Sequence, residues 1–177
     1  MGEYQLDTLA KYFAGIMTAR WQPMFGYTVV LTQPVDPSQL QAALHGALAR
    51  FPYFNVSFQR GWQWPCFAAL REPVGVEAFR GVSRIPLGEG RPLFRVSYQG
   101  HKIHLYFLHI LTDGYGALAF IKTLLIEYLA RGGLCAMPAP VAGAPEAEEY
   151  EDAIVRHCRP VKYRSPWRSK AYHVAGD

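Results

Sequence analysis

A histidine, an aspartate and a glycine lie close together in the middle of the sequence, in the stretch His109-Ile110-Leu111-Thr112-Asp113-Gly114. An imidazole with a pKa near neutrality can take a proton from a hydroxyl or an amine. Thr112 and Asp113 stand where a helix takes its cap, and glycine lets the chain turn closely. The spacing indicates a histidine held beside a turn, and we interpret His109 as a candidate general base.

The segments on either side of this motif predict where it lies. Residues 102–109 alternate, so that Ile103, Leu105, Phe107 and His109 share one face of a strand, and the strand is apolar on both faces, as a central strand is. From residue 114 to residue 131, apolar residues recur at steps of three and four, which predicts an amphipathic helix of about five turns. His109 is therefore expected to end a strand at the edge of a sheet, where a substrate can reach it.

With its surroundings, the pattern His-x-x-x-Asp-Gly resembles part of the His-His-x-x-x-Asp-Gly motif of CoA-dependent acyltransferases with the chloramphenicol acetyltransferase-like fold. It is most similar to the alcohol acetyltransferase branch, which is related to the condensation domains of peptide synthetases. The run that starts at Gly90-Arg-Pro-Leu-Phe, the hairpin at Gly100, and Thr-Asp-Gly-x-Gly-Ala before the long helix are similar to that family in order and spacing.

The resemblance implies a role for each residue of the motif. His109 would be the general base, and Asp113 would be mainly architectural, a partly buried acceptor usually paired with an arginine. Gly114 would let the turn pass close to the strand, and Gly116 would let another backbone or a ligand approach the start of the helix. Acyl-CoA would be a co-substrate that transfers its acyl group directly to a hydroxyl acceptor, with no tightly bound cofactor and no metal.

The sequence also departs from the family. Leu108 stands where the family has its first histidine, and the stretch that often supplies the arginine partner aligns with Phe54-Asn55-Val56. The Asp-Phe-Gly-Trp-type loop of the family's second lobe is not found in the sequence. We therefore interpret residues 1–135 as an N-terminal lobe, and residues 136–177 as a linker, a short helix and a crossover towards a missing second lobe.

These departures leave two functions open. The chain is either the N-terminal lobe of an O-acyltransferase or a non-catalytic binding or assembly module that kept the lobe and lost the reaction. Alone, the lobe is expected to be inactive and to self-associate, because it would leave apolar surface and an unpaired strand edge. In a third interpretation, His109 is a buried core histidine bonded to a backbone carbonyl.

Composition excludes several classes of protein. The chain has 177 residues, half of them apolar, and a net charge of +4, which suits one domain with a substantial core. Cys66, Cys135 and Cys158 show neither a disulfide framework nor zinc spacing, and reduced thiols in the cytoplasm are the simplest interpretation. No segment is expected to span a membrane. The run from Arg156 to Lys170 is basic, but the whole chain is only mildly basic, so a solvated linker is favoured over nucleic-acid binding.

The remaining elements complete the predicted fold. An apolar helical pattern runs from residue 6 to residue 17, residues 25–33 favour a strand, and Asp36-Pro37 starts a helix to about residue 50. Residues 54–59 and 63–69 predict a hairpin, in which Pro65 demotes the second arm to an edge or irregular strand. Residues 71–90 read as a loop with at most short structure, residues 92–99 as a strand, and a helix is expected to start at Pro145. We predict an α/β two-layer sandwich, with a mostly antiparallel mixed sheet covered by the helices at 36–50 and 114–131.

Overall fold

The computed structural model describes residues 3–18, 20–60, 65–133 and 151–158. In chain order these residues form β1 (Glu3–Gln5), α1 (Thr8–Ile16), β2 (Met24–Val30), α2 (Pro37–Arg50), a 3-10 turn η1 (Pro52–Phe54), β3 (Val56–Arg60), β4 (Pro65–Ala69), β5 (Val76–Ala78), β6 (Phe94–Gln99), β7 (Lys102–Leu108), α3 (Gly114–Arg131) and α4 (Ala153–His157).

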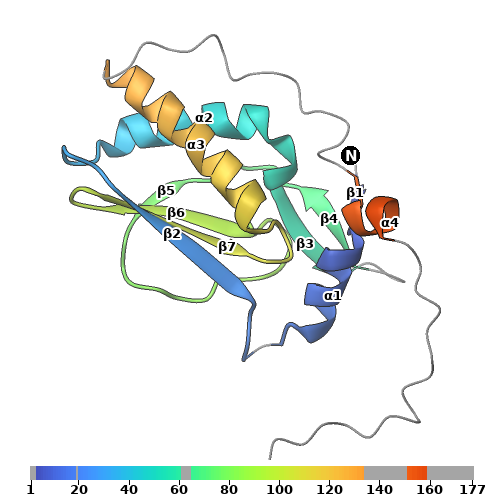
Figure 1. Ribbon diagram of the computed structural model, residues 1–177. Coiled ribbons are helices and arrows are strands. Elements are labelled where there is room, and N and C mark those ends of the chain that lie inside the picture. The colour runs from blue at the N-terminus through green and yellow to red at the C-terminus, as the bar shows by residue number, and fades with distance from the viewer. Residues whose placement is uncertain (1–2, 19, 61–64, 134–150, 159–177) are drawn as a thin grey trace, which may run out of the picture.

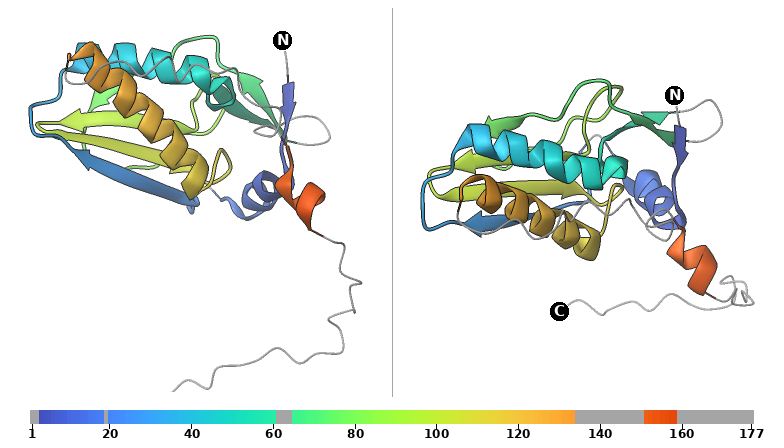
Figure 2. Two further views of the ribbon diagram at one scale, coloured as in Figure 1. Left: turned by 45° about the horizontal axis from the view of Figure 1, so that its top comes forward. Right: turned by 90° about the horizontal axis from the view of Figure 1, so that it is seen from above.

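A four-stranded mixed sheet forms one layer of the fold, in the order β2-β7-β6-β5. The pairs β2–β7 and β6–β7 are antiparallel, and the short strand β5 runs parallel to β6. Helices α2 and α3 lie side by side across one face of this sheet (Figures 1 and 2). The predicted two-layer α/β arrangement is confirmed, including the central place of β7 between its two neighbours.

The main core lies between the sheet and helices α2 and α3. Ile103, Leu105 and Phe107 of β7 are fully buried there, as the alternation of the strand predicts. The ring of Phe54 stacks on Phe120 of α3 at 4.6 Å between centroids, and Phe107 meets both rings edge-on at 6.2 Å. Because burying one phenylalanine side chain contributes about 1.5–3 kcal/mol, this aromatic group holds α3 firmly against the strand that carries the motif.

A second core occupies the opposite face of the sheet at the end where β7 finishes. Leu108, Leu93 and Ile110 are buried there together with Ala10 of α1 and Leu6, which lies just before that helix. Neighbouring residues of β7 thus serve different cores, with Phe107 in the first and Leu108 in the second. The strand therefore has to be apolar on both faces.

A three-stranded sheet, in the order β1-β4-β3, adjoins the main one. The prediction that Pro65 confines β4 to an edge is wrong, since β4 is the central strand of this sheet. Pro65 is the first residue of β4 and pairs with Arg60 on β3, while the partners of β1 lie further along, at 66–68. Proline lacks a backbone donor, and at this end of the strand no bond to β1 calls for one. The sequence analysis does not predict the strand β1.

The helix starts follow the capping signals. The side chain of Asp36 accepts hydrogen bonds from the N–H groups of Ser38 and Gln39 at 2.8 and 3.1 Å, with Pro37 at the first helical position. These bonds to backbone N–H groups lower the pKa of Asp36. The helix expected from Pro145 is corrected: 145–150 lie outside the described residues, 151–152 are not helical, and α4 begins at Ala153.

One carboxylate joins the two helices at the end of the sheet. Asp152 caps its own helix α4, and its Oδ2 also accepts hydrogen bonds from the backbone N–H and the hydroxyl of Thr8, both at 2.7 Å. Thr8 is the first residue of α1, so Asp152 meets the positive ends of two helices at once. The Thr8 hydroxyl and the backbone donors lower the pKa of Asp152. Helix α4 thereby lies beside α1 (Figure 1).

The described part of the chain contains no helix that could cross a membrane. The predicted boundary after residue 135 and the predicted crossover, which begins at residue 170, lie outside the described residues.

The histidine within β7 is buried on the face of the sheet away from α2 and α3. His104 is 7% exposed, its ring stacks on Phe79 at 4.0 Å, and its Nδ1 shares a hydrogen bond of 3.0 Å with the hydroxyl of Thr28. Its Nε2 is buried with no hydrogen-bond partner among the described residues. Burial, and then the nearby charge of Lys102, lower the pKa of His104, so the folded protein holds this imidazole in its neutral form.

This burial predicts a loss of stability in mild acid. In the unfolded chain a histidine has a pKa of about 6.5, so below that pH the unfolded state binds a proton that folded His104 resists, and unfolding is favoured. The contribution of buried, neutral His104 to the free energy of unfolding is fully present above pH ~6.5. It is lost as the pH falls towards the lowered pKa of His104 in the folded state. We expect the Tm to fall between about pH 7.5 and pH 5.5, and to fall less in the His104→Phe variant. If the Tm falls equally with pH in the parent and in His104→Phe, His104 is not the cause of the loss of stability.

Candidate functional site around His109

His109 directly follows the last residue of β7 and continues its pairing with the neighbouring strand. Its backbone N–H donates a hydrogen bond of 2.8 Å to the carbonyl of Pro23, just before β2. At the other end of the pair, the N–H of Leu31 donates to the carbonyl of His101 at 2.8 Å. The ladder therefore fixes His109 in register at the end of the sheet, as the sequence predicts.

The imidazole of His109 lies between two phenylalanine rings, at the place where the two cores meet. It stacks on Phe13 of α1 at 4.8 Å between ring centroids, with an interplanar angle of 16°, and it lies 4.4 Å from the ring of Phe25 of β2. The side chain is half-buried. Neither phenylalanine stands out in the sequence, because Phe13 belongs to an ordinary apolar helical stripe and Phe25 to an ordinary strand. Only the folding of α1 and β2 against β7 reveals them.

The two ring nitrogens of His109 have different surroundings. Nδ1 is buried and has no hydrogen-bond partner among the described residues. The bond to a backbone carbonyl that a core histidine would make is therefore not seen in this part of the chain. Since Nδ1 is closed to solvent, proton transfer to a substrate in this conformation has to use Nε2. An imidazole that accepts a proton at Nε2 carries its own proton on Nδ1, which requires an acceptor that the described residues do not offer.

Asp113 caps α3, but its surroundings differ from the expectation. Its Oδ1 accepts a hydrogen bond of 2.8 Å from the N–H of Gly116, which is the capping bond that the sequence predicts. The side chain is exposed rather than partly buried, and among the described residues it forms no ion pair with an arginine. At the aligned position, Asn55 Oδ1 is buried without a partner of its own among these residues. Asp113 thus shapes the turn through the backbone alone.

The two glycines of the motif have distinct surroundings. A Cβ on Gly116 would overlap the Thr112 hydroxyl, so the absence of a side chain lets the turn close against the helix. The space expected for another backbone or a ligand is filled by Thr112. The carbonyl of Gly114 accepts a hydrogen bond of 3.4 Å from the Tyr27 hydroxyl, which ties the start of α3 to β2.

Leu108, at the position of the family's first histidine, points away from the candidate site. It is fully buried in the second core. Side chains alternate along a strand, so residues 108 and 109 have to face opposite ways. The imidazole of His109 therefore lies on the opposite face of the strand from Leu108.

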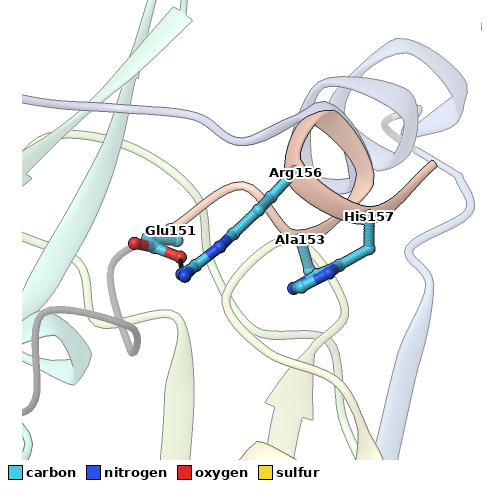
Figure 3. A pocket seen from close by; sticks show the side chains of 4 residues that line it. All are labelled: Glu151, Ala153, Arg156 and His157. Atoms are coloured by element: carbon cyan, nitrogen blue, oxygen red, sulfur yellow. Dashed lines mark hydrogen bonds and ion pairs between the residues drawn. The ribbon is translucent and has the colours of Figure 1, made fainter. Parts of the chain in front are cut away.

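Two hollows in the described surface lie elsewhere. One, of about 280 Å³, is lined by Glu151, Ala153, Arg156 and His157 of the α4 region, where Glu151 pairs with Arg156 (Figure 3). These residues are exposed. The other, of about 200 Å³, lies by β5 and the start of β6. His109 lines neither of these two hollows.

Solved structures of condensation-domain-like proteins share this fold. The starter condensation domain of rhizomide synthetase RzmA superposes with a TM-score of 0.62 and 14% identity, over 81% of this chain and 40% of that one. The X-domain from teicoplanin biosynthesis gives 0.62 and 18%, over 81% and 36%. Polyketide synthase associated protein 5 from Mycobacterium tuberculosis gives 0.60 and 16%, over 99% and 47%. No protein-family model and no curated protein matches the sequence.

These superpositions define the class of fold. The chain has the fold of part of these condensation-domain-like proteins. It spans less than half the length of each of these three structures. A variant of the RzmA starter domain has also been solved in complex with C8-CoA, with a TM-score of 0.62 to this chain.

The two polar residues of the motif should differ in the damage that their loss causes. Asp113→Ala removes the cap of α3 and should cost about 0.5–2 kcal/mol, seen as a lower Tm. His109→Ala should leave the Tm nearly unchanged, because the lost ring contacts are offset by removal of an unsatisfied buried nitrogen. Asp113→Asn, which keeps a capping oxygen, is the matched control and should melt like the parent. If His109→Ala melts earliest of the three, the imidazole is a core residue.

Proposed function

We propose that this chain is the N-terminal lobe of a CoA-dependent O-acyltransferase in which His109 is the general base. The observation that carries the proposal is the placement of a half-buried imidazole at the end of β7, beside a turn capped by Asp113. Because Nδ1 is buried, the reactive nitrogen in this proposal is Nε2. The RzmA starter-domain variant, which shares this fold, binds C8-CoA, and this supports acyl-CoA as the co-substrate.

The reaction needs one proton carrier and no covalent intermediate on the protein. The acceptor hydroxyl donates its proton to Nε2 of His109 as its oxygen bonds to the thioester carbonyl carbon. The tetrahedral intermediate then collapses, the C–S bond breaks, and the CoA thiolate takes the proton from the imidazolium. A base in this role contributes about 10² to 10⁴ in rate.

The unpartnered Nδ1 of His109 needs a hydrogen-bond acceptor, which a second lobe could supply. To work through Nε2, His109 has to carry a proton on Nδ1, and this proton needs an acceptor. The described residues supply none, so the acceptor comes from outside them or the ring turns when the substrate binds. A second lobe would also exclude water and position both substrates, and these effects lower much of the barrier.

A second candidate function is supported by two of the same observations. Leu108 stands in place of the family's first histidine and is buried in the second core. Nδ1 of His109 has no hydrogen-bond partner in the described structure. Both features suit a lobe that binds or assembles without catalysing. Such a module would leave C8-CoA intact even when a second lobe is present.

The isolated chain should show no appreciable acyltransferase activity. Given C8-CoA and small alcohols, it should release CoA thiol no faster than the uncatalysed reaction, because an open face neither excludes water nor aligns the reactants. The measurement is a colorimetric assay of free thiol. Robust turnover by the 177-residue chain would show that no second lobe is required.

A two-lobed form built on this lobe tests the role of the base. His109→Ala should lower its turnover about 10² to 10⁴-fold with little change in Tm. His101→Ala is the matched control, since His101 is exposed beside the opposite end of β7, and it should keep full activity. Turnover that survives in His109→Ala refutes the base. A two-lobed parent that binds C8-CoA but never consumes it establishes the non-catalytic function.

A further inference from the structure

The strand β2 lies at the edge of the four-stranded sheet, and its outer side is not paired with any described strand. Its seven residues pair with β7 over their whole length, from Met24 opposite Leu108 to Val30 opposite Lys102. Figure 1 shows β2 as the outermost strand of the sheet. An edge of this length presents a row of backbone groups that can pair with another strand.

The pairing with β7 determines which backbone groups face outwards. The carbonyl of Pro23 accepts a hydrogen bond from the N–H of His109, and the N–H of Leu31 donates one to the carbonyl of His101. In an antiparallel ladder, hydrogen-bonded positions alternate with non-bonded ones, so the odd-numbered residues of β2 bond to β7. The N–H and C=O groups of the even-numbered residues therefore face outwards: Met24, Gly26, Thr28 and Val30.

The composition of β2 leaves this edge unprotected. Its sequence, Met-Phe-Gly-Tyr-Thr-Val-Val, contains no charged residue and no proline, which are the usual devices that prevent pairing at an edge. The other edge strands among the described residues, β1, β3 and β5, each include a charged residue in their sequence, namely Glu3, Arg60 and Glu77. The sequence of β2 therefore does not prevent another strand from pairing with this edge.

The side chains of β2 on the helix side are only partly covered. Phe25, Tyr27 and Val29 pack against the main core but remain half-buried, since no further strand flanks them in the described structure. All three are aromatic or β-branched, the residue types that stabilise a sheet most through cross-strand pairs. A strand that bears similar side chains would complete their burial.

We propose that β2 pairs antiparallel with β2 of a second copy of this chain, about a twofold axis at Tyr27. This register sets Gly26 opposite the partner's Thr28, and Met24 opposite the partner's Val30. All four positions then turn their free backbone groups towards each other, so they form the hydrogen-bonded pairs of the new ladder. The two sheets join into one continuous sheet of eight strands.

The same register makes the edge complementary to itself, which is why a second copy is the occupant. Like charges close to the twofold axis would repel each other, and β2 has none. Phe25 lies opposite the partner's Val29, and Tyr27 lies opposite the partner's Tyr27. Since Phe25 touches the His109 ring, the second copy closes the flank of the candidate site. The pairing does not depend on any catalytic role.

A matched pair of substitutions at Thr28 tests the pairing. The N–H of Thr28 faces outwards, so Thr28→Pro removes a donor of the proposed interface without removing a hydrogen bond to β7. Thr28→Val keeps that N–H. Both variants lose the hydrogen bond between the Thr28 hydroxyl and His104, so the backbone N–H at the edge is the group that distinguishes them. By light scattering, the parent and Thr28→Val should have twice the mass of Thr28→Pro. A monomeric parent, or a dimeric Thr28→Pro, overturns the proposal.

Cysteine cross-linking tests the register and does not depend on whether Thr28→Pro folds. Across a non-hydrogen-bonded pair the Cα atoms are about 4.5 Å apart, within the range that a disulfide spans. With the three native cysteines replaced by serine, Tyr27→Cys should form a disulfide-linked dimer on mild oxidation. Val29→Cys should not, because it lies opposite the partner's Phe25 and about 13 Å from its own symmetry mate. No cross-link at Tyr27, or equal cross-linking of both variants, overturns the proposed register.

Discussion

The placement of His109 depends on the hydrogen-bonded register of β7 between β2 and β6. Bonds at both ends of the β2–β7 pair, from His109 to Pro23 and from Leu31 to His101, prevent the strands from sliding. Side chains alternate along a strand, so a slip of one residue would bury the imidazole in the second core and present Leu108 in its place. The apolar demands of two different cores, on the two faces of β7, make such a slip costly.

The aromatic packing beneath α3 extends this constraint to the turn. Phe54, Phe107 and Phe120 fix the helix against the strand, so the few residues between them have little freedom. Asp113 and Gly116 then close the turn with one capping bond and one missing side chain. The imidazole is placed by the sheet and the helix together, whereas its environment comes from Phe13 and Phe25, on elements far away in the sequence.

Strong local signals made much of this fold predictable. Asp36 followed by Pro37 specifies a helix start through backbone geometry alone, and the bounds of α3 follow from periodicity and its glycine stop. The failures have physical reasons as well. The strand β1 has three residues, too few to show a period, and β4 is central because β1 pairs beyond Pro65. The contacts of His109 could not be predicted, since they depend on tertiary packing and not on any local pattern.

The hydrogen bonds of Asp152 connect the last described helix to the surroundings of the candidate site. One carboxylate connects the start of α4 to the start of α1, and the ring of Phe13 on α1 rests on the imidazole of His109. Direct contacts therefore run from α4 through α1 to the ring that covers the imidazole, although α4 and His109 lie far apart in the sequence.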